Sequence, residues 1–494
     1  KKLEDLNNNV SQKDGINTTS NEKSSFDPIE VLPLELIGII FSYFSLTFNL
    51  ECLTVCKLWN KTLKNPNTFV FKDFLLKKNI KKLELVKFFK FLDIVDPLKY
   101  LNSINLEPHQ SVEQSCLSLF FINPLILQGS FKINMNETNY FGLLSYIKKG
   151  KINFSKLKYL NLRVPLYLTE NLRLEETLKL CSNLQTLILK IPKFDSRSKI
   201  STENFITLSE LKFLSIDVES NAINSPLNSL LLNSFLLNNS FPILEHLSLF
   251  RLKIDQSILK SLITPYLKII EFNDIPELSI ASVLNILLDN LEPTKSKLKE
   301  IRMVEKDTTM DSSHRDWKND LMSSKLLINL NTLMLRNSCI TPSLLDNILL
   351  ASSSQIKSLH LVLNRNLTFQ NRLTGSSIQS VYESANISNW IIKIPKIREL
   401  SLVGCPGFNR LTLNELINTA LPNHIFDNLS FLNLSMNNID GNSLMQLFKK
   451  PYNFKLNRLS IEYCHVNPDT VRYILENNIC KHIDYKMDDR LILE

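Results

Sequence analysis

The chain has 494 residues, of which 44% are hydrophobic and 21% charged, and its formal net charge is +8 with an isoelectric point near 8.9. This length exceeds what one compact core usually spans, so we expect several domains or an array of repeats. Only nine glycines occur, and neither GxGxxG nor GxxxxGKS/T is present, which argues against a nucleotide-binding fold. The positive charge is mild and is more typical of a solvated surface than of a nucleic-acid-binding face.

The cysteines and histidines predict neither a metal site nor a disulfide framework. No CxxC pair occurs and the seven histidines do not cluster at metal-ligand spacing, so we expect no metal and no cofactor. Scattered thiols are typical of a reducing compartment. No apolar run reaches the roughly 18 residues of a membrane span, and no secretory signal is seen. The chain begins with Lys1 rather than Met, so we expect it to be a piece of a longer protein.

The first 26 residues are polar and rich in Asn, Ser, Thr and Lys. Because they lack apolar periodicity, we predict a disordered linker over 1–26. The dipeptide Asp27-Pro28 then breaks the pattern and starts the ordered part, a first domain over 27–66.

Three helices are predicted within residues 32–63, which read LPLELIGIIFSYFSLTFNLECLTVCKLWNKTL. The first runs from Pro33 to Phe44, because apolar residues recur at i, i+3, i+4, i+7 and i+8 from Leu36. A second stretch has Asn49 as its N-cap, and a third includes Trp59. The apolar surface is too large for about 32 residues to bury alone, so we interpret this segment as a docking module.

The motif LxxLxL recurs eleven times from Leu157 onward. We interpret residues 67–150, which mix short helices and strands, as an adaptor region that caps the array. The motif then starts at 157, 184, 211, 244, 267, 298, 330, 356, 397, 429 and 456, at intervals of 23 to 41 residues. A mean interval of about 30 lies at the upper edge of the leucine-rich-repeat range.

Residues 151–494 are therefore predicted to form a curved α/β solenoid with a parallel concave sheet. Each unit is one strand with a return helix or loop, and neighbouring units must stack to bury their leucines. The segment around Ile479 and Ile483 is expected to be a terminal cap. Four polar residues that follow the motif are expected to turn inward and bond the backbone: Cys339, Cys405, Asn437 and Cys464. The long intervals suggest loops over 305–320 and 365–390, with either a binding role or none.

The concave face is predicted from the alternation of side chains along each strand, which turns the leucines inward and their neighbours outward. It is a mixed surface of aromatic and basic residues, the usual anchors of protein interfaces. Phosphates of a duplex would need denser Lys and Arg, so we expect a protein substrate, with a phosphorylated segment read by paired arginines as one version. The candidate substrate-binding residues are Tyr159, Arg163, Lys190, Phe213, Phe250, Arg251, Arg302 and Arg336.

Residues 32–63 resemble the F-box. The match consists of Leu-Pro-x-Glu at the start, an Ile/Leu-rich first helix, and then a Leu, a Val and a Trp at the family's spacing. The pair Phe48-Asn49 departs from the pattern, since an acidic or basic residue is common there. The repeats resemble the leucine-rich repeats of F-box proteins, so the two resemblances cover about 33–63 and 157–484.

In that family the F-box binds a Skp-type adaptor, which hangs from a cullin scaffold with a RING subunit, and the repeats hold a protein substrate. The resemblance implies a non-catalytic substrate receptor of an SCF-type ubiquitin ligase, nuclear or cytoplasmic. Each residue implied to bind the adaptor could instead pack within the module. For Leu32, Pro33 and Leu36 we favour contact with the adaptor. The implied adaptor-binding residues are Leu32, Pro33, Leu36, Ile39, Ile40, Leu50, Val55 and Trp59.

A narrower resemblance is to the fungal F-box type that has tetratricopeptide repeats before the F-box and associates with the replisome. The polar linker and the yeast-like composition fit this type, which would imply a role in DNA replication, although no tetratricopeptide is visible in the sequence.

We also considered three other functions. A repeat scaffold could use its F-box outside ubiquitylation. An enzyme finds no support, because no Ser/His/Asp or Cys/His constellation, paired-carboxylate motif or metal spacing is seen. A nucleic-acid binder would show a steep salt dependence of duplex binding.

Overall fold

The computed structural model describes residues 27–44, 46–65, 73–75, 103–106, 132–135, 154–163, 174–191, 206–219, 233, 235–237, 239–292, 296–306, 315–352, 354–369, 385–448 and 455–486. The chain divides after residue 72 into two compact units, each described here by itself. The predicted linker over 1–26 lies outside the described residues.

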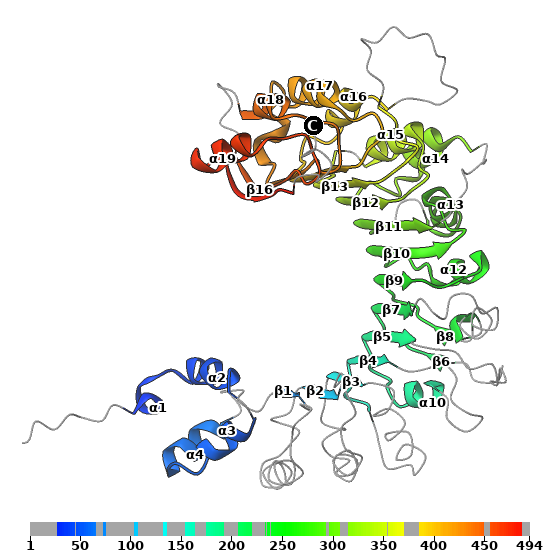
Figure 1. Ribbon diagram of the computed structural model, residues 1–494. Helices are drawn as coiled ribbons and strands as arrows, with labels where there is room; N and C mark the ends of the chain where they lie inside the picture. The colour runs from blue at the N-terminus through cyan, green and yellow to red at the C-terminus, as the bar shows by residue number, and fades with distance from the viewer. Residues whose placement is uncertain are drawn as a thin grey trace, which may run out of the picture. The chain divides into compact units, whose positions relative to one another are not determined.

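The N-terminal unit is a cluster of short helices, labelled in Figure 1: α1 (Pro28–Val31), α2 (Leu34–Ser42), α3 (Leu46–Cys52) and α4 (Lys57–Leu63). Helix α1 was not predicted. It begins because Pro28 suits a first helical position and the Asp27 carboxylate accepts the N–H of Ile29 at 3.0 Å. Helix α2 is shorter than predicted, with Pro33 as its N-cap.

Asn49 is not the N-cap that the sequence suggested. It lies inside α3 and is 4% exposed, and its Nδ2 donates to the carbonyl of Phe41 at 3.1 Å, tying α3 to α2. A buried amide on a helix needs such a partner, and the neighbouring helix supplies it. The N-cap of the last helix of this unit, α4, is Cys56, whose sulfur accepts the N–H of Trp59 at 3.5 Å.

The second unit is built on one 15-stranded sheet in which every pair of neighbours is parallel. All eleven LxxLxL motifs form strands of this sheet, which confirms the predicted repeat solenoid. These strands are β4 (Tyr159–Arg163), β5 (Thr186–Ile191), β7 (Phe213–Val218), β9 (His246–Phe250), β10 (Ile269–Pro276), β11 (Glu300–Lys306), β12 (Thr332–Arg336), β13 (Ser358–Val362), β14 (Glu399–Val403), β15 (Phe431–Asn433) and β16 (Leu456–Ser460).

The sheet extends beyond the predicted repeats at both ends. Strands β1 (Asp73–Leu75), β2 (Ser103–Leu106) and β3 (Lys132–Met135) precede β4 within the range interpreted as an adaptor region. Strand β17 (Cys480–Asp484) pairs with β16 where a terminal cap was expected. Strand β2 has the motif in the relaxed form of several counted repeats, Leu101…Ile104-Asn-Leu106, which the sequence analysis missed. The other three strands lack a leucine or isoleucine at its first position, and strand pairing needs only a backbone and one buried face.

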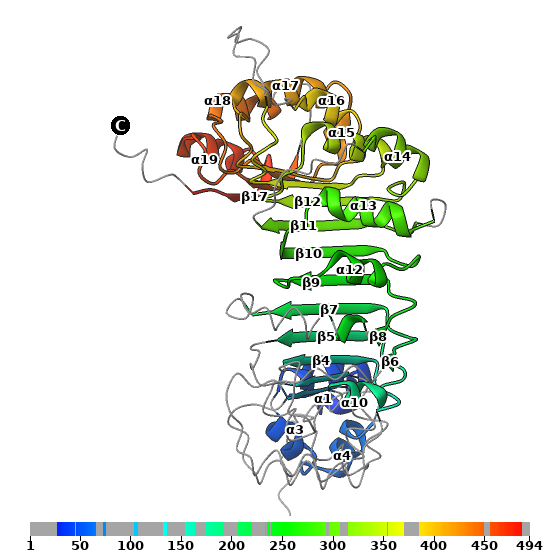
Figure 2. The ribbon, with the colours of Figure 1, turned by 90° about the vertical axis from the view of Figure 1, so that its right-hand side faces the viewer.

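Helices and short segments return the chain between strands and cover one face of the sheet (Figures 1 and 2). We call the opposite face the open face, since no described helix of this unit covers it in Figure 1. The returns comprise α10 (Leu174–Lys179), the pair β6 (Ile206–Thr207) and β8 (Asn239–Ser240), α12 (Gln256–Leu262), α13 (Ile280–Asn290), α14 (Trp317–Ser324), α15 (Pro342–Ala351), α16 (Ile387–Ile391), α17 (Arg410–Ala420), η3 (Ile425–Asn428), α18 (Gly441–Met445), η4 (Gln446–Phe448) and α19 (Pro468–Glu476).

A repeated backbone interaction fixes the register of the strands. The carbonyl of the residue before each of ten strands, from β4 to β15 of the long sheet, accepts two N–H groups from the next repeat; Lys268, for example, accepts from Lys299 at 2.7 Å and Glu300 at 3.1 Å. We call these residues the pre-strand residues: Lys158, Gln185, Lys212, Glu245, Lys268, Lys299, Asn331, Lys357, Arg398 and Ser430.

Inward-facing polar residues satisfy the backbone where the strands end. Nδ2 of Asn437 donates to the carbonyls of Leu402 and Leu434, and its Oδ1 accepts from the N–H of Cys405 at 3.0 Å. Asn364 makes the same kind of contact two repeats earlier, with the carbonyl of Leu335. The predicted roles of Asn437, Cys405 and Cys464 are thus confirmed, since both thiols also face backbone carbonyls.

Cys339 does not take the predicted inward position. Ser338, three residues after the last motif leucine, is buried there instead, while Cys339 is half-buried. Both residues bond Glu305, which was predicted to start a surface loop but lies in β11 and is 3% exposed. Its carboxylate accepts from Ile280 N at 2.9 Å, Ser338 Oγ at 2.6 Å and Cys339 N at 2.9 Å.

The rest of the two predicted loops is described only in part. Residues 307–314 and 370–384 lie outside the described residues. Trp390, expected at the end of the second loop, is buried in α16 and packs edge-on against Phe369 with 5.5 Å between ring centroids. The insertion therefore begins and ends in the core.

The Asn437 interaction gives a direct test of this architecture. Asn437→Ala leaves two carbonyls and one N–H without their side-chain partner, and we expect the free energy of unfolding to fall by about 2 kcal/mol. Asn438→Ala changes the exposed neighbouring residue and should leave it within about 0.5 kcal/mol. Urea denaturation followed by far-UV circular dichroism measures both, and equal stability of the two variants would contradict the assignment.

Candidate functional site

The N-terminal unit has an apolar face that it does not bury itself. Leu36, Ile39 and Ile40 of α2 are 45%, 54% and 41% exposed, and Tyr43 and Phe44 continue the same exposed surface. We call these five residues the α2 face. Contiguous exposed apolar surface of this kind marks an interaction site more often than a solvated one.

The opposite side of α2 packs into the unit. Ile37 and Phe41 are buried, as are Cys52, Leu53 and Leu63 of the following segments. The α2 face is therefore surplus to the core of this small unit, as the sequence predicted.

The implied adaptor-binding residues do not all lie on one helix. Leu36, Ile39 and Ile40 share one helix surface, while Pro33 is exposed before α2 and Leu32 is half-buried. Val55 is 61% exposed in the turn after α3, and Leu50 lies within α3.

Trp59 stands apart from them because it holds the unit together. Its Nε1–H donates to both oxygens of the Asp27 carboxylate, at 3.2 and 3.1 Å, and its ring meets Phe41 edge-on with 5.9 Å between centroids. Of the two roles left open for Trp59, these contacts favour packing within the module. The sequence offered no signal for the Asp27 contact, which joins residues 32 positions apart.

On the open face, the predicted alternation of side chains is observed. Along β4 the leucines are buried while Tyr159, Asn161 and Arg163 reach the surface. The predicted substrate-binding residues Lys190, Phe213, Phe250, Arg302 and Arg336 occupy equivalent outward positions on β5, β7, β9, β11 and β12. They are spread along the sheet and do not converge on one compact site.

Two of the predicted basic residues are already paired on the surface. Arg163 contacts Glu219 at 2.5 Å, and Arg302 contacts Glu300 at 2.6 Å. Such exposed pairs are worth little energy and can be exchanged for a ligand's charge.

Arg251 follows β9, and its guanidinium reaches Asp217, an outward residue of β7 on the open face. The Arg251 φ of 52° takes the chain out of the extended conformation directly after β9, and the guanidinium bonds the Asp217 carboxylate and, at 2.8 Å, the carbonyl of Val218. The motif frame placed Arg251 one residue beyond the end of the strand, where the side chain serves the turn.

Two aromatic residues of the open face lie against charged or titratable side chains of neighbouring strands. The rings of Phe213 and His246 lie 4.3 Å apart on adjacent strands. Phe431 lies 6.2 Å from the ring of His360 and 5.9 Å from the guanidinium of Arg458. Both histidines were missed as site residues because one sequence gives no signal for a cross-strand contact.

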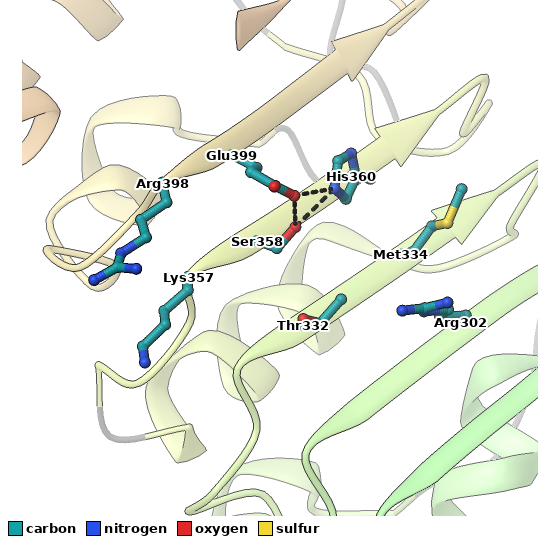
Figure 3. A pocket seen from close by; sticks show the side chains of 8 residues that line it. All are labelled: Arg302, Thr332, Met334, Lys357, Ser358, His360, Arg398 and Glu399. Atoms are coloured by element: carbon teal, nitrogen blue, oxygen red, sulfur yellow. Dashed lines mark hydrogen bonds and ion pairs between the residues drawn. The ribbon is translucent and has the colours of Figure 1, made fainter. Parts of the chain in front are cut away.

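A polar cluster recurs on this face and is shown in Figure 3. Ser358 Oγ lies 2.7 Å from His360 Nε2 and donates to Glu399 Oε2 at 2.7 Å. A second cluster repeats the arrangement on β9 and β10: Ser248 Oγ lies 2.8 Å from His246 Nε2 and donates to Glu271 at 3.1 Å. We call them the Ser358 cluster and the Ser248 cluster.

The Ser358 cluster has the residue types of a hydrolase but not the geometry. In a Ser–His–acid relay the serine and the carboxylate contact opposite ring nitrogens. Here both lie on Nε2, with the Glu399 oxygen 3.5 Å away, and the hydroxyl hydrogen points to the carboxylate. The cluster therefore orients side chains across strands and does not activate the serine.

Burial lowers the pKa of His360 and of His246 below the ordinary value of 6.5. The nearby carboxylates Glu399 and Glu271 oppose this effect, and the cation of Arg302 adds to it at both sites. Both imidazoles are consequently held in the neutral form at pH 7.

A hollow of about 280 Å³ lies beside the Ser358 cluster. In Figure 3, Lys357 and Arg398 lie side by side at the starts of β13 and β14, with Arg302 on the far side of the cluster. The hollow is lined by Arg302, Thr332, Met334, Lys357, Ser358, His360, Arg398 and Glu399.

Among the described residues, no group of three or more His, Cys, Asp or Glu side chains could hold a metal ion. Within the same part of the chain, no helix combines the length and apolar character that crossing a bilayer requires.

Three cysteines are buried in the core of the solenoid. Burial raises the pKa of the Cys181 and Cys405 thiols to about 12 and that of the Cys464 thiol to about 11.

No protein-family model matches the chain, and no curated protein matches its sequence. Among solved structures it is similar to an internalin of Listeria monocytogenes, at 15% identity and a TM-score of 0.38, over 73% of this chain and 88% of the internalin. It is also similar to TLR13 in the TLR13-ssRNA13 complex, at 14% identity and a TM-score of 0.37, over 78% of this chain and 55% of TLR13. Strand order, register and motif define the repeat fold of this chain without these likenesses.

The two histidine clusters predict a pH dependence of stability. Because the folded pKa of His246 and His360 lies below the unfolded value, the unfolded chain binds more protons, and stability falls as the pH drops through about 6.5. We expect the urea midpoint to fall between about pH 7.5 and about pH 5.5, and to fall less in the His246→Gln, His360→Gln double variant. The exposed His465→Gln is the control, and an unchanged pH response of the double variant would contradict the prediction.

Proposed function

We propose that the chain is a non-catalytic substrate-recognition subunit of an SCF-type cullin-RING ubiquitin ligase. The α2 face would bind a Skp-type adaptor, which connects to the cullin and RING subunits, and the open face of the solenoid would bind a protein substrate. The observation that supports this most is the exposed α2 face on a helical unit too small to need it, joined to a repeat solenoid.

The helical unit supports adaptor binding because different residues pack its core and form its exposed apolar face. Ile37, Phe41, Leu63 and the Trp59–Asp27 contact hold the helices together. Leu36, Ile39 and Ile40 are left for a partner, at positions that the F-box resemblance assigns to the adaptor. Docking an amphipathic helix by its apolar side is a common mode of protein recognition.

The solenoid supports protein binding through a continuous, mixed surface. A repeat sheet offers a long face on which polar, aromatic and basic side chains succeed each other strand by strand. In this proposal the complex acts in the nucleus or cytoplasm, and the narrower resemblance would place it at the replisome during DNA replication.

The α2 face can be tested by a matched pair of variants. Leu36→Ser with Ile40→Ser removes two exposed apolar side chains, and we expect adaptor binding to weaken by about 2 kcal/mol, roughly thirtyfold. The control is Ile328→Ser with Ile392→Ser, which removes two similarly exposed residues, 39% and 51%, from the solenoid. Isothermal titration with a purified Skp-type adaptor measures both, and equal affinities would refute the assignment of the face.

A scaffold that binds the adaptor outside ubiquitylation is the alternative. The two functions differ in the next subunit, because only a ligase receptor must assemble with the cullin. We expect the full chain, the adaptor and the cullin to elute together in size-exclusion chromatography, and the Leu36→Ser, Ile40→Ser variant to elute separately. Elution with the adaptor but without the cullin would favour the scaffold.

A further inference from the structure

The pre-strand residues form a row along the edge of the sheet where the strands begin. Each carbonyl is fixed by two N–H groups of the next repeat; Lys357, for example, accepts from Arg398 at 2.7 Å and Glu399 at 3.0 Å. Neighbouring members are therefore about 4.8 Å apart, the spacing of paired strands.

The row is far more basic than the chain as a whole. Six of its ten members are Lys or Arg and one is Glu, whereas Lys and Arg make up 57 of the 494 residues. Backbone geometry places no demand on the side chain at this position, since Gln, Asn and Ser occupy it in other repeats. The enrichment needs another cause, and charge is what the six members share.

Only part of this charge is neutralised. Lys268 contacts Glu245 at 2.6 Å, and the pKa of Glu245 is lowered chiefly by that hydrogen bond, with Lys212 and Lys297 also contributing. One carboxylate thus serves several cations. Lys299, Lys357 and Arg398 are exposed, and their side chains make no hydrogen bond or ion pair with the part of the chain that the structure describes.

The row meets the hollow beside the Ser358 cluster. Lys357 and Arg398 border it together in Figure 3, and Met334 is among the residues that line it. Two adjacent cations over a recess of about 280 Å³ offer room for one acidic side chain or phosphate group to be held from both sides.

The ligand must be narrow, because acidic residues flank the row. Glu300 and Glu399 directly follow Lys299 and Arg398, and Glu271 lies on β10, all on the open face. A duplex nucleic acid, with one charge per about 1.7 Å of axis, would be repelled by these carboxylates. A single extended chain can follow the row without crossing them.

We infer that the row from Lys268 to Arg398 binds an extended acidic segment of a protein, with Asp, Glu or phosphorylated Ser or Thr side chains. Four strand spacings cover about 19 Å, which matches roughly six residues of extended chain. The inference rests on the proposed function only in taking the partner to be a protein, and it assigns recognition to the edge of the sheet beside the predicted open-face residues.

Fluorescence anisotropy on the full chain tests the inference. The probes are labelled peptides of about ten residues in which Glu, phosphoserine or Gln alternates with Gly, and a single-stranded oligothymidine of the same length. We expect the Glu or the phosphoserine peptide to bind, with affinity that falls as salt rises, and the tighter of the two identifies the acidic group. The Gln peptide should not bind.

The variant Lys299→Glu, Lys357→Glu, Arg398→Glu should weaken acidic-peptide binding at least tenfold. The control Lys260→Glu, Lys306→Glu, Lys318→Glu alters exposed residues away from the row and also lowers the formal net charge from +8 to +2; it should retain binding. If the first variant loses its circular dichroism spectrum, the milder Lys299→Gln, Lys357→Gln, Arg398→Gln set replaces it.

Equal peptide affinity in the two triple variants would overturn the inference, as would equal binding of the Gln peptide. Tighter binding of oligothymidine, lost in the first variant, would overturn it in favour of nucleic acid. Adaptor binding is measured on the same proteins. Its failure in the unaltered chain refutes the proposed function alone, whereas absent peptide binding with intact adaptor binding refutes only this inference.

Discussion

The two-to-one hydrogen bond at each pre-strand carbonyl is the constraint on which the solenoid depends. A strand whose leucines point to one side cannot bury them until a neighbour lies beside it in the correct register. The carbonyls of residues such as Lys268 and Lys357 set that register by taking two N–H groups at once. Leucines, inward polar residues and outward side chains are then aligned from strand to strand, and the open face and the row of pre-strand residues follow from that alignment.

The sequence predicted the solenoid because its signal is local and repeated. Each LxxLxL motif predicts one strand and identifies the face that the strand buries. The unpredicted parts lack that local signal. Strands β1 and β3 pair with their neighbours without a complete motif of their own. Helix α1 forms because Asp27 caps it and also accepts the indole N–H of Trp59, a residue far along the chain. Asn49 was predicted to be an N-cap because asparagine is common at helix starts. It can instead be buried inside α3 because its amide donates a hydrogen bond to the carbonyl of Phe41.

The candidate sites were predictable to a smaller degree. Amphipathic spacing identified Leu36, Ile39 and Ile40, whose exposure is a property of one helix. Positions that depend on where a strand ends were not predictable from the motif, so Cys339 was preferred to Ser338. Contacts between strands left no trace in one sequence; the Ser358 cluster brings together residues 41 positions apart, and Glu305 joins three separate segments.

The register also separates two kinds of evolutionary change. Intervals between repeats range from 23 to 41 residues, yet β13 and β14, on either side of the longest, remain paired residue for residue. Phe369 and Trp390, in the return between these two strands, pack edge-on against each other and are buried. Selection can therefore lengthen or shorten the returns without redrawing the recognition surface, and can substitute outward residues one strand at a time without disturbing the core.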